Sequence, residues 1–498
     1  MSTVSAHYSI VIVGTDLAGL AYGALCAKRG YRVLVIGQGP SGALYTHSNH
    51  TLCRRLELNY GLSGSIVRRV FDELSMGLQL RNLPRRLEPS FQVVLPKARI
   101  AVTTQPKLAE REFKREFVGQ DAAISTFFRD ITQVDSQVLD VLNVRPVLPP
   151  SGFLESFKLK SQTKKYPLLG DDLAIDDPLS SFEHGNPFRA FVQAPFRFAS
   201  GMVPARPYPA TFARAITELW HGCCAFDQGP NTLLDLFTGM IAGSGDVRPQ
   251  SVVRHITIQR SKATQVMLRD RKELISFDLL VCNGDPKRFF ALIPQQTQND
   301  DYHHQIHMLQ PICHTFIGNF VVRAAAVPEA MGRHVFAVAD LSLSLEEDNL
   351  IHIGVDCDVG PSAPERELRL ITAAMRVPIS AAAAGTDGVE SLLDRLQARI
   401  EETMPFLREH LVMRHSPWQG WGQQSSNDDI DPAELQPGYG EAIAHTIGTT
   451  PLATLTGYKN VLVGGNAAFC GLGAEGPYLA AWNLLQHTLD KVVLKQGF

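Results

Sequence analysis

The sequence lacks the residue spacings of a metal or redox centre. Its eight cysteines, at positions 26, 53, 223, 224, 282, 313, 357 and 470, form no Cys-x-x-Cys pair and no metal-ligand spacing with histidine. The adjacent Cys223 and Cys224 do not have the spacing of a redox motif that opens a helix. We therefore expect reduced, structural thiols and no metal site.

A strong net charge and a long apolar run are also missing. The chain carries 47 Lys and Arg against 50 Asp and Glu, a formal net charge of −3, whereas nucleic-acid-binding domains usually carry a strongly basic patch. No stretch of about twenty residues is apolar enough to span a bilayer. Residues 1–7 contain no Lys or Arg of a secretion signal. We expect a cytoplasmic protein without a nucleic-acid partner.

The composition that remains is that of a large globular protein. The 498 residues are 45% hydrophobic and 19% charged, which suits two or three folded domains.

Residues 8–36 have the pattern of a βαβ unit. An apolar run at 8–13 predicts a buried parallel strand, and Gly14 ends it at a tight turn. Apolar residues then recur at helical spacing from Leu17 to Leu25, Gly30 is placed to end the helix, and 33–36 predict a second buried strand. A unit of about thirty residues in this order predicts a dinucleotide-binding domain.

The glycine motif of the first turn is altered. It reads Gly14-Thr15-Asp16-Leu17-Ala18-Gly19, so aspartate replaces the middle glycine, which normally lets the backbone approach a pyrophosphate. An ionised Asp16 facing phosphate would cost roughly 4 kcal/mol for each charge pair. If Asp16 instead turns away and caps the helix, the cofactor still fits.

The second strand also ends unusually. Gly37 stands where an acidic residue normally binds the ribose hydroxyls, and Gln38 follows it as a neutral substitute. Two alternatives remain open: a working dinucleotide site, or a doubly wound α/β domain that no longer holds a dinucleotide.

Residues 180–212 are unusually aromatic. Seven aromatic residues occur there among several prolines, against 8% in the whole chain: Phe182, Phe188, Phe191, Phe196, Phe198, Tyr208 and Phe212. They could line a pocket for a long apolar ligand, although aromatic clusters more often form core.

A second block far along the chain predicts further parts of the first sheet. Residues 226–241 indicate a turn and a helix, and 252–268 indicate a strand and an antiparallel ribbon. A buried strand then ends in the turn Asn283-Gly284-Asp285-Pro286. We expect one sheet assembled from separated segments.

A third block, residues 460–485, brings a glycine-rich turn to the start of a helix. Gly465-Asn466 follows an apolar strand, and Gly471, Gly473-Ala474 and Gly476 precede the helix. A helix N-terminus favours an anionic or electron-rich ligand edge. Two such turns, one near each end of the chain, suit a large two-ended cofactor such as FAD.

Taken in this order, the three blocks resemble the phytoene desaturase and carotenoid isomerase branch of FAD-dependent oxidoreductases over nearly the whole chain. The likeness lies in residues 227–233, 253–256, 281–286, 402–408 and 465–476. It differs at Asp16 and Gly37, at Asn466, where the family has aspartate, and at Cys470, where it has proline.

The resemblance implies FAD as the cofactor and assigns its contacts. Gly14, Thr15 and Gly19, with Asp16 among them, would lie at the pyrophosphate, Gln38 near ribose and Val253 at adenine. The ribityl chain and isoalloxazine would lie along Gly465, Asn466, Gly473 and Ala474. No residue stands out as a catalytic acid or base, and His415 and Trp418 are better explained by packing or solvation.

The expected fold class is α/β. A Rossmann-like FAD-binding domain would comprise residues 1–80, 215–290 and 440–498, and an α+β substrate-binding domain on an antiparallel sheet would comprise 81–214 and 291–439.

The resemblance further implies a redox or redox-assisted isomerisation reaction on an apolar, polyene or isoprenoid substrate, for which peripheral contact with a membrane would be reasonable. The alternative is a cofactor-free protein that binds a lipid, an isoprenoid or another protein. GDP-dissociation inhibitors are the analogy, since they share this fold with an altered glycine motif. Fold alone does not separate the two.

Overall fold

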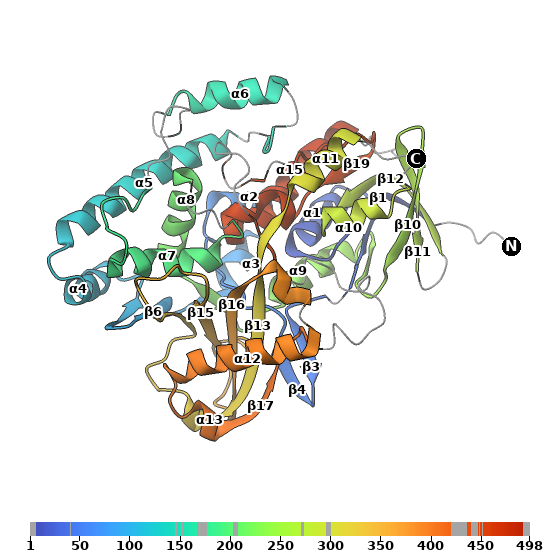
Figure 1. Ribbon diagram of the computed structural model, residues 1–498. Coiled ribbons are helices and arrows are strands. Elements are labelled where there is room, and N and C mark those ends of the chain that lie inside the picture. The colour runs from blue at the N-terminus through green and yellow to red at the C-terminus, as the bar shows by residue number, and fades with distance from the viewer. Residues whose placement is uncertain are drawn as a thin grey trace.

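The computed structural model describes residues 6–39, 41–144, 147–150, 153–166, 169, 177–202, 208–269, 273–294, 300–383, 385–419, 436–439, 447, 449–450 and 452–491. Two sheets organise the chain, each with its own hydrophobic core (Figure 1).

The first sheet is built from distant segments, as the sequence predicts. Its strands run in the order β10 (Val253–Gln259), β11 (Lys262–Leu268), β12 (Leu274–Cys282), β1 (Ala6–Val13), β2 (Val33–Ile36) and β9 (Asp246–Arg248). A further strand, β19 (Val461–Val463), pairs with β12. β1 lies parallel to both β2 and β12. Consecutive apolar residues suit these central strands because both faces of a parallel sheet are covered.

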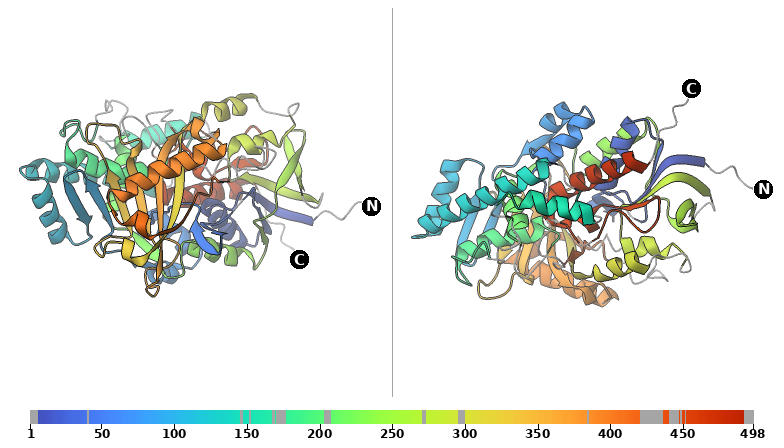
Figure 2. Two further views of the ribbon diagram at one scale, coloured as in Figure 1. Left: turned by 60° about the horizontal axis from the view of Figure 1, so that its bottom comes forward. Right: turned by 90° about the horizontal axis from the view of Figure 1, so that it is seen from above.

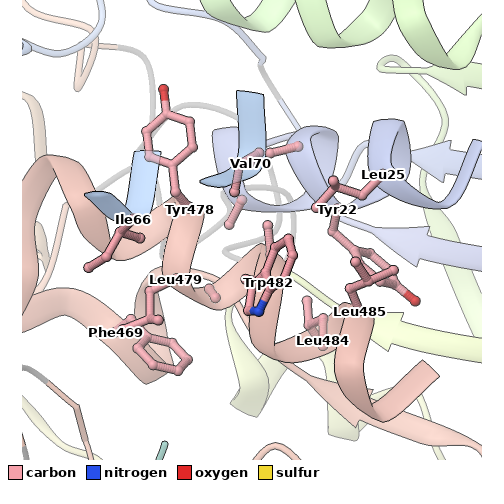
Figure 3. Close-up of a cluster of buried hydrophobic side chains, with 14 of the residues drawn as sticks. Tyr22, Leu25, Ile66, Val70, Phe469, Tyr478, Leu479, Trp482, Leu484 and Leu485 are labelled. Atoms are coloured by element: carbon pink, nitrogen blue, oxygen red, sulfur yellow. The ribbon is translucent and has the colours of Figure 1, made fainter. Parts of the chain in front are cut away.

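Helices cover the faces of this sheet. Ten consecutive residues of α1 (Leu17–Lys28), Ala18–Ala27, are buried, which explains why this helix is apolar on all sides. α1 packs against α9 (Thr232–Ile241) and α15 (Gly476–Lys491). In Figure 3, Trp482, Leu484 and Leu485 of α15 lie beside Tyr22 and Leu25 of α1. The C-terminal helix therefore closes the core that the N-terminal βαβ unit begins.

The second sheet is mainly antiparallel. Its order is β17 (Leu411–His415), β13 (Pro311–Arg323), β16 (Leu368–Pro378), β15 (Glu347–Val355), β14 (His334–Val338), β6 (Phe91–Leu95) and β7 (Ala98–Val102), and β18 (Gly438–Tyr439) pairs with β13. Only the β14–β6 pair is parallel among these described strands. The expected fold class, a Rossmann-like domain from separated segments with an α+β domain on an antiparallel sheet, is confirmed.

Helices also pack on the second sheet. α12 (Gly385–Glu401) lies across its strands (Figure 1) and buries Leu392, Leu393 and Leu396 against them. A separate core joins β6, β7 and β14 to α5 (Asp121–Asn143), α7 (Pro187–Ala199) and α8 (Pro209–Trp220). Figure 2 shows these helices grouped away from the chain termini.

Shorter elements complete the described chain. They are the hairpin β3 (Leu44–His47) and β4 (His50–Cys53), the pair β5 (Pro84–Arg86) and β8 (Cys224–Phe226), and the helices α2 (Ser65–Glu73), α3 (Gly77–Asn82), α4 (Pro106–Glu116), α6 (Phe153–Thr163), α10 (Pro286–Ala291), α11 (Asp300–Met308), α13 (Leu407–His410) and α14 (Asn466–Phe469). All eight cysteines are buried. Among the described residues, no helix combines the length and apolar character needed to cross a bilayer.

Candidate functional site

The turn between β1 and α1 makes a close approach that requires glycine. Gly14 has φ +120°, and a Cβ there would lie 2.9 Å from the backbone of Asn283 and Gly284. A Cβ on Gly19 would lie 2.4 Å from Nδ2 of Asn283. The end of β12 therefore packs directly on the glycine motif, and Thr15 lies in the same turn.

Asn283 is enclosed by glycines from both ends of the chain. Besides Gly14 and Gly19, it meets Gly465, whose φ is +78° and whose Cβ would lie 2.8 Å from Oδ1 of Asn283. Asn283 is 1% exposed, yet neither its amide nitrogen nor its amide oxygen has a hydrogen-bond partner among the described residues. Since buried polar groups are normally satisfied, this amide is a candidate ligand contact.

Asp16 does not cap α1. It occupies the N-cap position without a side-chain hydrogen bond to the helix, and it lines the cavity described below. Its carboxylate lies 3.5 Å from Nη1 of Arg55, whose Nε lies 3.5 Å from Oε1 of Glu57. Burial raises the pKa of Glu57, although Arg55 acts to lower it. Arg55 thus offsets the negative charge that Asp16 brings to the turn.

The end of β2 has no room for an acidic side chain. A Cβ on Gly37 would lie 1.8 Å from the carbonyl oxygen of Pro249, just after β9. The next residue, Gln38, borders a hollow of only about 10 Å³ with Arg288 and Phe289, and its buried Nε2 bonds to none of the residues that the structure describes. A ribose could reach Gln38 only after these side chains move.

Val253, expected at adenine, is 2% exposed and packs in the core with Val13 and Leu34. The side chain of Val253 therefore lies on the same face of the first sheet as the side chain of Val13, the last residue of β1. No ligand contact of its side chain follows from the geometry.

The C-terminal glycine turn packs tightly on a tyrosine. Gly473 has φ +52°, and a Cβ there would lie 1.9 Å from the hydroxyl of Tyr60 and 2.0 Å from the carbonyl oxygen of Ala199. Tyr60 donates a hydrogen bond to that carbonyl at 2.7 Å. Gly473 and Ala474 both line the cavity. The side chain of Asn466 lies outside the described residues.

One cavity of about 300 Å³ borders both glycine turns, a volume within the lower range of small-molecule sites. Both domains line it: residues 16–18, 55–60 and 283–285 near the first turn, Ala467, Cys470, Gly473, Ala474, Pro477 and Tyr478 near the last, and Phe198, Thr315, Ile317, Ala374, Arg376 and Tyr439 on the side of the antiparallel sheet. Gly14 and Gly19 pack against Asn283 and are not among the described residues that line the cavity. The structure thus brings together most of the expected cofactor residues, whereas Gln38 and Val253 are not among the described residues that line the cavity. The hollow beside Gln38 shares Gly284 and Asp285 with it.

Arg376, on β16 of the antiparallel sheet, lines the cavity opposite the glycine turns and stabilises the backbone there. It is 6% exposed, and its Nη2 donates to the carbonyl oxygens of Arg197, in the last turn of α7, and, at 2.9 Å, of Ser200, the residue that follows α7. Ser200 in turn donates to the carbonyl of Gly471 at 3.1 Å. A cation at a helix C-terminus is favourable, so Arg376 fixes α7 against the C-terminal turn.

A buried ionic cluster lies beneath the same turn. Arg214 of α8 donates to Glu475 at 2.8 Å, to Glu218 at 2.5 Å and to Asp135 of α5 at 3.1 Å. All four side chains are at most 5% exposed. Glu475 directly follows the Gly473–Ala474 turn, so the cluster anchors one end of the cavity wall.

The aromatic segment is mainly core. Phe182, Phe188, Phe191, Phe196 and Phe212 are buried together between α7, α8 and the second sheet. Only Phe198, of the described aromatic residues in that segment, lines the cavity. The pocket expectation therefore holds for one residue of the segment.

His415 and Trp418 lie away from the cavity. His415 lies in a separate open groove, where its ring stacks on that of His47 with 3.7 Å between the ring centroids. Burial, and to a lesser extent the neighbouring His47, lowers the pKa of His415 to about 4. Trp418 is 2% exposed beside Phe316. Neither is among the described residues that line the cavity.

Sequence reasoning missed several residues of the wall. Asn283 stands in the Asn-Gly-Asp-Pro turn that the resemblance singled out, and its position after a buried strand was the available signal. Arg55, Tyr60, Arg376 and Tyr478 carry no local pattern that points to a ligand.

Comparison with known proteins agrees with this architecture. Residues 12–74 match the family described as NAD(P)-binding Rossmann-like domain. Comparison with curated protein sequences gives no match.

Solved structures share the fold across the whole chain. An oxidoreductase from Methanosarcina mazei has 14% identity and a TM-score of 0.56, over 96% of this chain and all of that one. A putrescine oxidase double mutant has 14% identity and a TM-score of 0.57, over 98% and 100%. A Rab GDI from Plasmodium falciparum has 11% identity and a TM-score of 0.51, over 97% and 99%. At these identities the likeness shows the fold alone.

Proposed function

We propose that the protein is an FAD-dependent oxidoreductase that acts on an apolar substrate of the polyene or isoprenoid class, as the resemblance to phytoene desaturases implies. The observation that carries this proposal is the shared cavity. It runs from Asp16 and Asn283 at the N-terminal glycine turn to Gly473 and Ala474 at the C-terminal turn, and on to the antiparallel sheet. A flavin supplies hydride or electron transfer when bound.

Unsatisfied polar groups support a polar ligand along this path. The amide of Asn283 and the hydroxyl of Tyr478, which line the cavity, are buried without a hydrogen-bond partner in the described part of the chain. The same holds for Nε2 of Gln38 beyond the turn. The N-terminus of α1 presents backbone N–H groups at the same turn. These groups fit a dinucleotide with its pyrophosphate at Asn283, provided that the side chains around Gln38 move.

The remaining wall fits an apolar substrate. Ile317, Ala374 and Phe198 present apolar surface opposite the C-terminal turn, where they would bind the substrate and exclude water. Arg376 is a positioning residue, since it holds the end of α7 beside this surface.

The test is flavin uptake by the purified protein. We expect an oxidised-flavin absorption spectrum, or tight uptake when FAD is titrated into flavin-free protein. Asn283→Ala should weaken FAD binding roughly ten-fold or more, because a hydrogen bond to a charged group is lost. The same substitution should leave stability nearly unchanged, since this amide bonds to no described residue. Asn82→Ala, at an exposed position on α3, is the control.

The cofactor-free alternative is favoured by one observation, the close approach of Pro249 to Gly37, which removes the usual ribose contact. It requires the same cavity to hold a lipid or isoprenoid tail. Absence of FAD uptake by folded protein, together with binding of an apolar fluorescent probe, would replace the oxidoreductase proposal with this one.

A further inference from the structure

The outer face of α6 carries unusual surface chemistry. Phe153, Leu154 and Phe157 are 84%, 74% and 65% exposed. No other described helix exposes three large apolar side chains. Figure 1 shows α6 at the edge of the molecule, above the helices that cover the second sheet. Large apolar side chains gathered on one exposed face indicate an interaction site.

The same face is basic. Lys158, Lys160, Lys164 and Lys165 are exposed, and backbone bonds from Lys164 to Lys160 and from Lys165 to Gln162 continue the helical turn past Thr163. At 100° per residue Lys160 and Lys164 project to the same side as Phe153 and Phe157, and Lys158 and Lys165 lie at the flank of that face.

The opposite face of α6 packs against the rest of the protein. Leu159 and Tyr166 pack against the core of the first domain. Glu155, the only acidic residue in 153–166, is spaced to lie with them and is half-buried. The outward face of this described segment therefore combines large apolar groups with positive charge alone.

We infer that this face docks the protein on an anionic lipid surface. Helices that lie in a membrane interface combine Phe and Leu with Lys or Arg in this way, and basic side chains near an anionic leaflet add attraction. A protein partner fits less well, because lysine is depleted at protein–protein interfaces. The inference does not depend on the flavin.

Vesicle co-sedimentation of the full chain tests the inference. We expect binding to vesicles of phosphatidylcholine mixed with phosphatidylserine, weaker binding as salt is raised, and little binding to phosphatidylcholine alone. The double variant Phe153→Ser/Phe157→Ser should lower the partition constant roughly ten-fold or more. Lys160→Gln and Lys164→Gln should each lower it on the order of five-fold.

Matched controls separate α6 from general surface effects. Phe406→Ser removes another exposed phenylalanine, 59% exposed, and Lys97→Gln removes an exposed lysine on another element. Both should bind vesicles as the unmodified protein does. All the positions changed are exposed, so the variants should fold, which circular dichroism would verify.

Three outcomes would overturn the inference. The first is no binding to phosphatidylserine vesicles. The second is binding that the α6 variants leave unchanged, which would place the lipid contact elsewhere. The third is self-association that Phe153→Ser/Phe157→Ser abolishes without vesicle binding, measured by sedimentation, which would make this face an interface between copies of the chain.

Discussion

Asp16 and Arg55 place opposite charges 3.5 Å apart where a pyrophosphate would meet α1. An isolated carboxylate here would repel phosphate. Arg55 offsets part of this negative charge, but it also lies 3.5 Å from Glu57. The side chains of Asp16 and Arg55 are partly exposed, so their attraction is screened. We therefore expect Asp16 to weaken a pyrophosphate site at this turn without abolishing it.

Asp16→Asn should tighten FAD binding about five-fold, because it removes a like charge and releases Arg55 to meet the phosphates. Quenching of flavin fluorescence on binding measures the dissociation constant. Arg55→Gln is the matched partner and should weaken binding, since it leaves Asp16 uncompensated. Weaker FAD binding by Asp16→Asn would show that the carboxylate itself helps to hold the ligand.

The approach of β9 to β2 shapes the site at the level of whole strands. β9 pairs with β2 from Leu34 to Ile36, and the chain after it brings the Pro249 carbonyl to within 1.8 Å of where a Gly37 Cβ would stand. The ribose-binding acid is thus excluded by the packing of the sheet and its adjoining turn.

Restoring that acid should therefore fail. Gly37→Glu should destabilise the protein by about 3 kcal/mol, the upper range for overpacking, and should not tighten FAD binding. Urea denaturation and FAD titration provide the two measurements. Gln38→Glu, one residue further along, is the control and should be far less destabilising. A Gly37→Glu variant with normal stability and tighter FAD binding would contradict this description of the strand end.

These elements also show which parts of the structure could be predicted from the sequence alone. β1, α1 and β2 were predictable because their apolar spacing is local, and Gly30 ends the helix with φ +84° as expected. The contact between Gly37 and Pro249 was not, because it joins positions far apart in the chain. The same holds for Asn283, which acquires its role only when β12 is placed against both glycine turns.

Across the whole molecule, the Arg214 cluster joins α5, α8 and the turn before α15. One guanidinium among three buried carboxylates would leave an excess of negative charge if all were ionised, and buried charge of that kind is costly. Burial raises the pKa of Asp135 despite Arg214. Burial opposes ionisation of Glu218 too, but His221 and Arg214 lower its pKa. The proton is thus best held on Glu475.

This arrangement predicts a pH-dependent stability. Burial raises the pKa of Glu475 to about 7, although Arg214 acts to lower it. In the unfolded chain the pKa of a glutamate is about 4.3. Between these values the folded protein keeps a proton that the unfolded chain has lost. The free energy of unfolding therefore falls as pH rises through this window, by at most about 4 kcal/mol from this group.

Glu475→Gln should reduce this decrease in the free energy of unfolding with pH, because glutamine retains the size and an acceptor for Arg214 but does not titrate. Urea denaturation at a series of pH values from 4 to 8 measures the free energy of unfolding. Glu218, whose Oε1 lies 3.7 Å from Nδ1 of His221, raises the pKa of that histidine. This adds a decline of the same sign, so His221→Gln reports its separate share. Glu110→Gln, in an exposed pair with Lys114, should leave the decline in place. If Glu475→Gln retains the full decline, the proton resides elsewhere in the cluster, and the anchoring of the C-terminal turn does not depend on it.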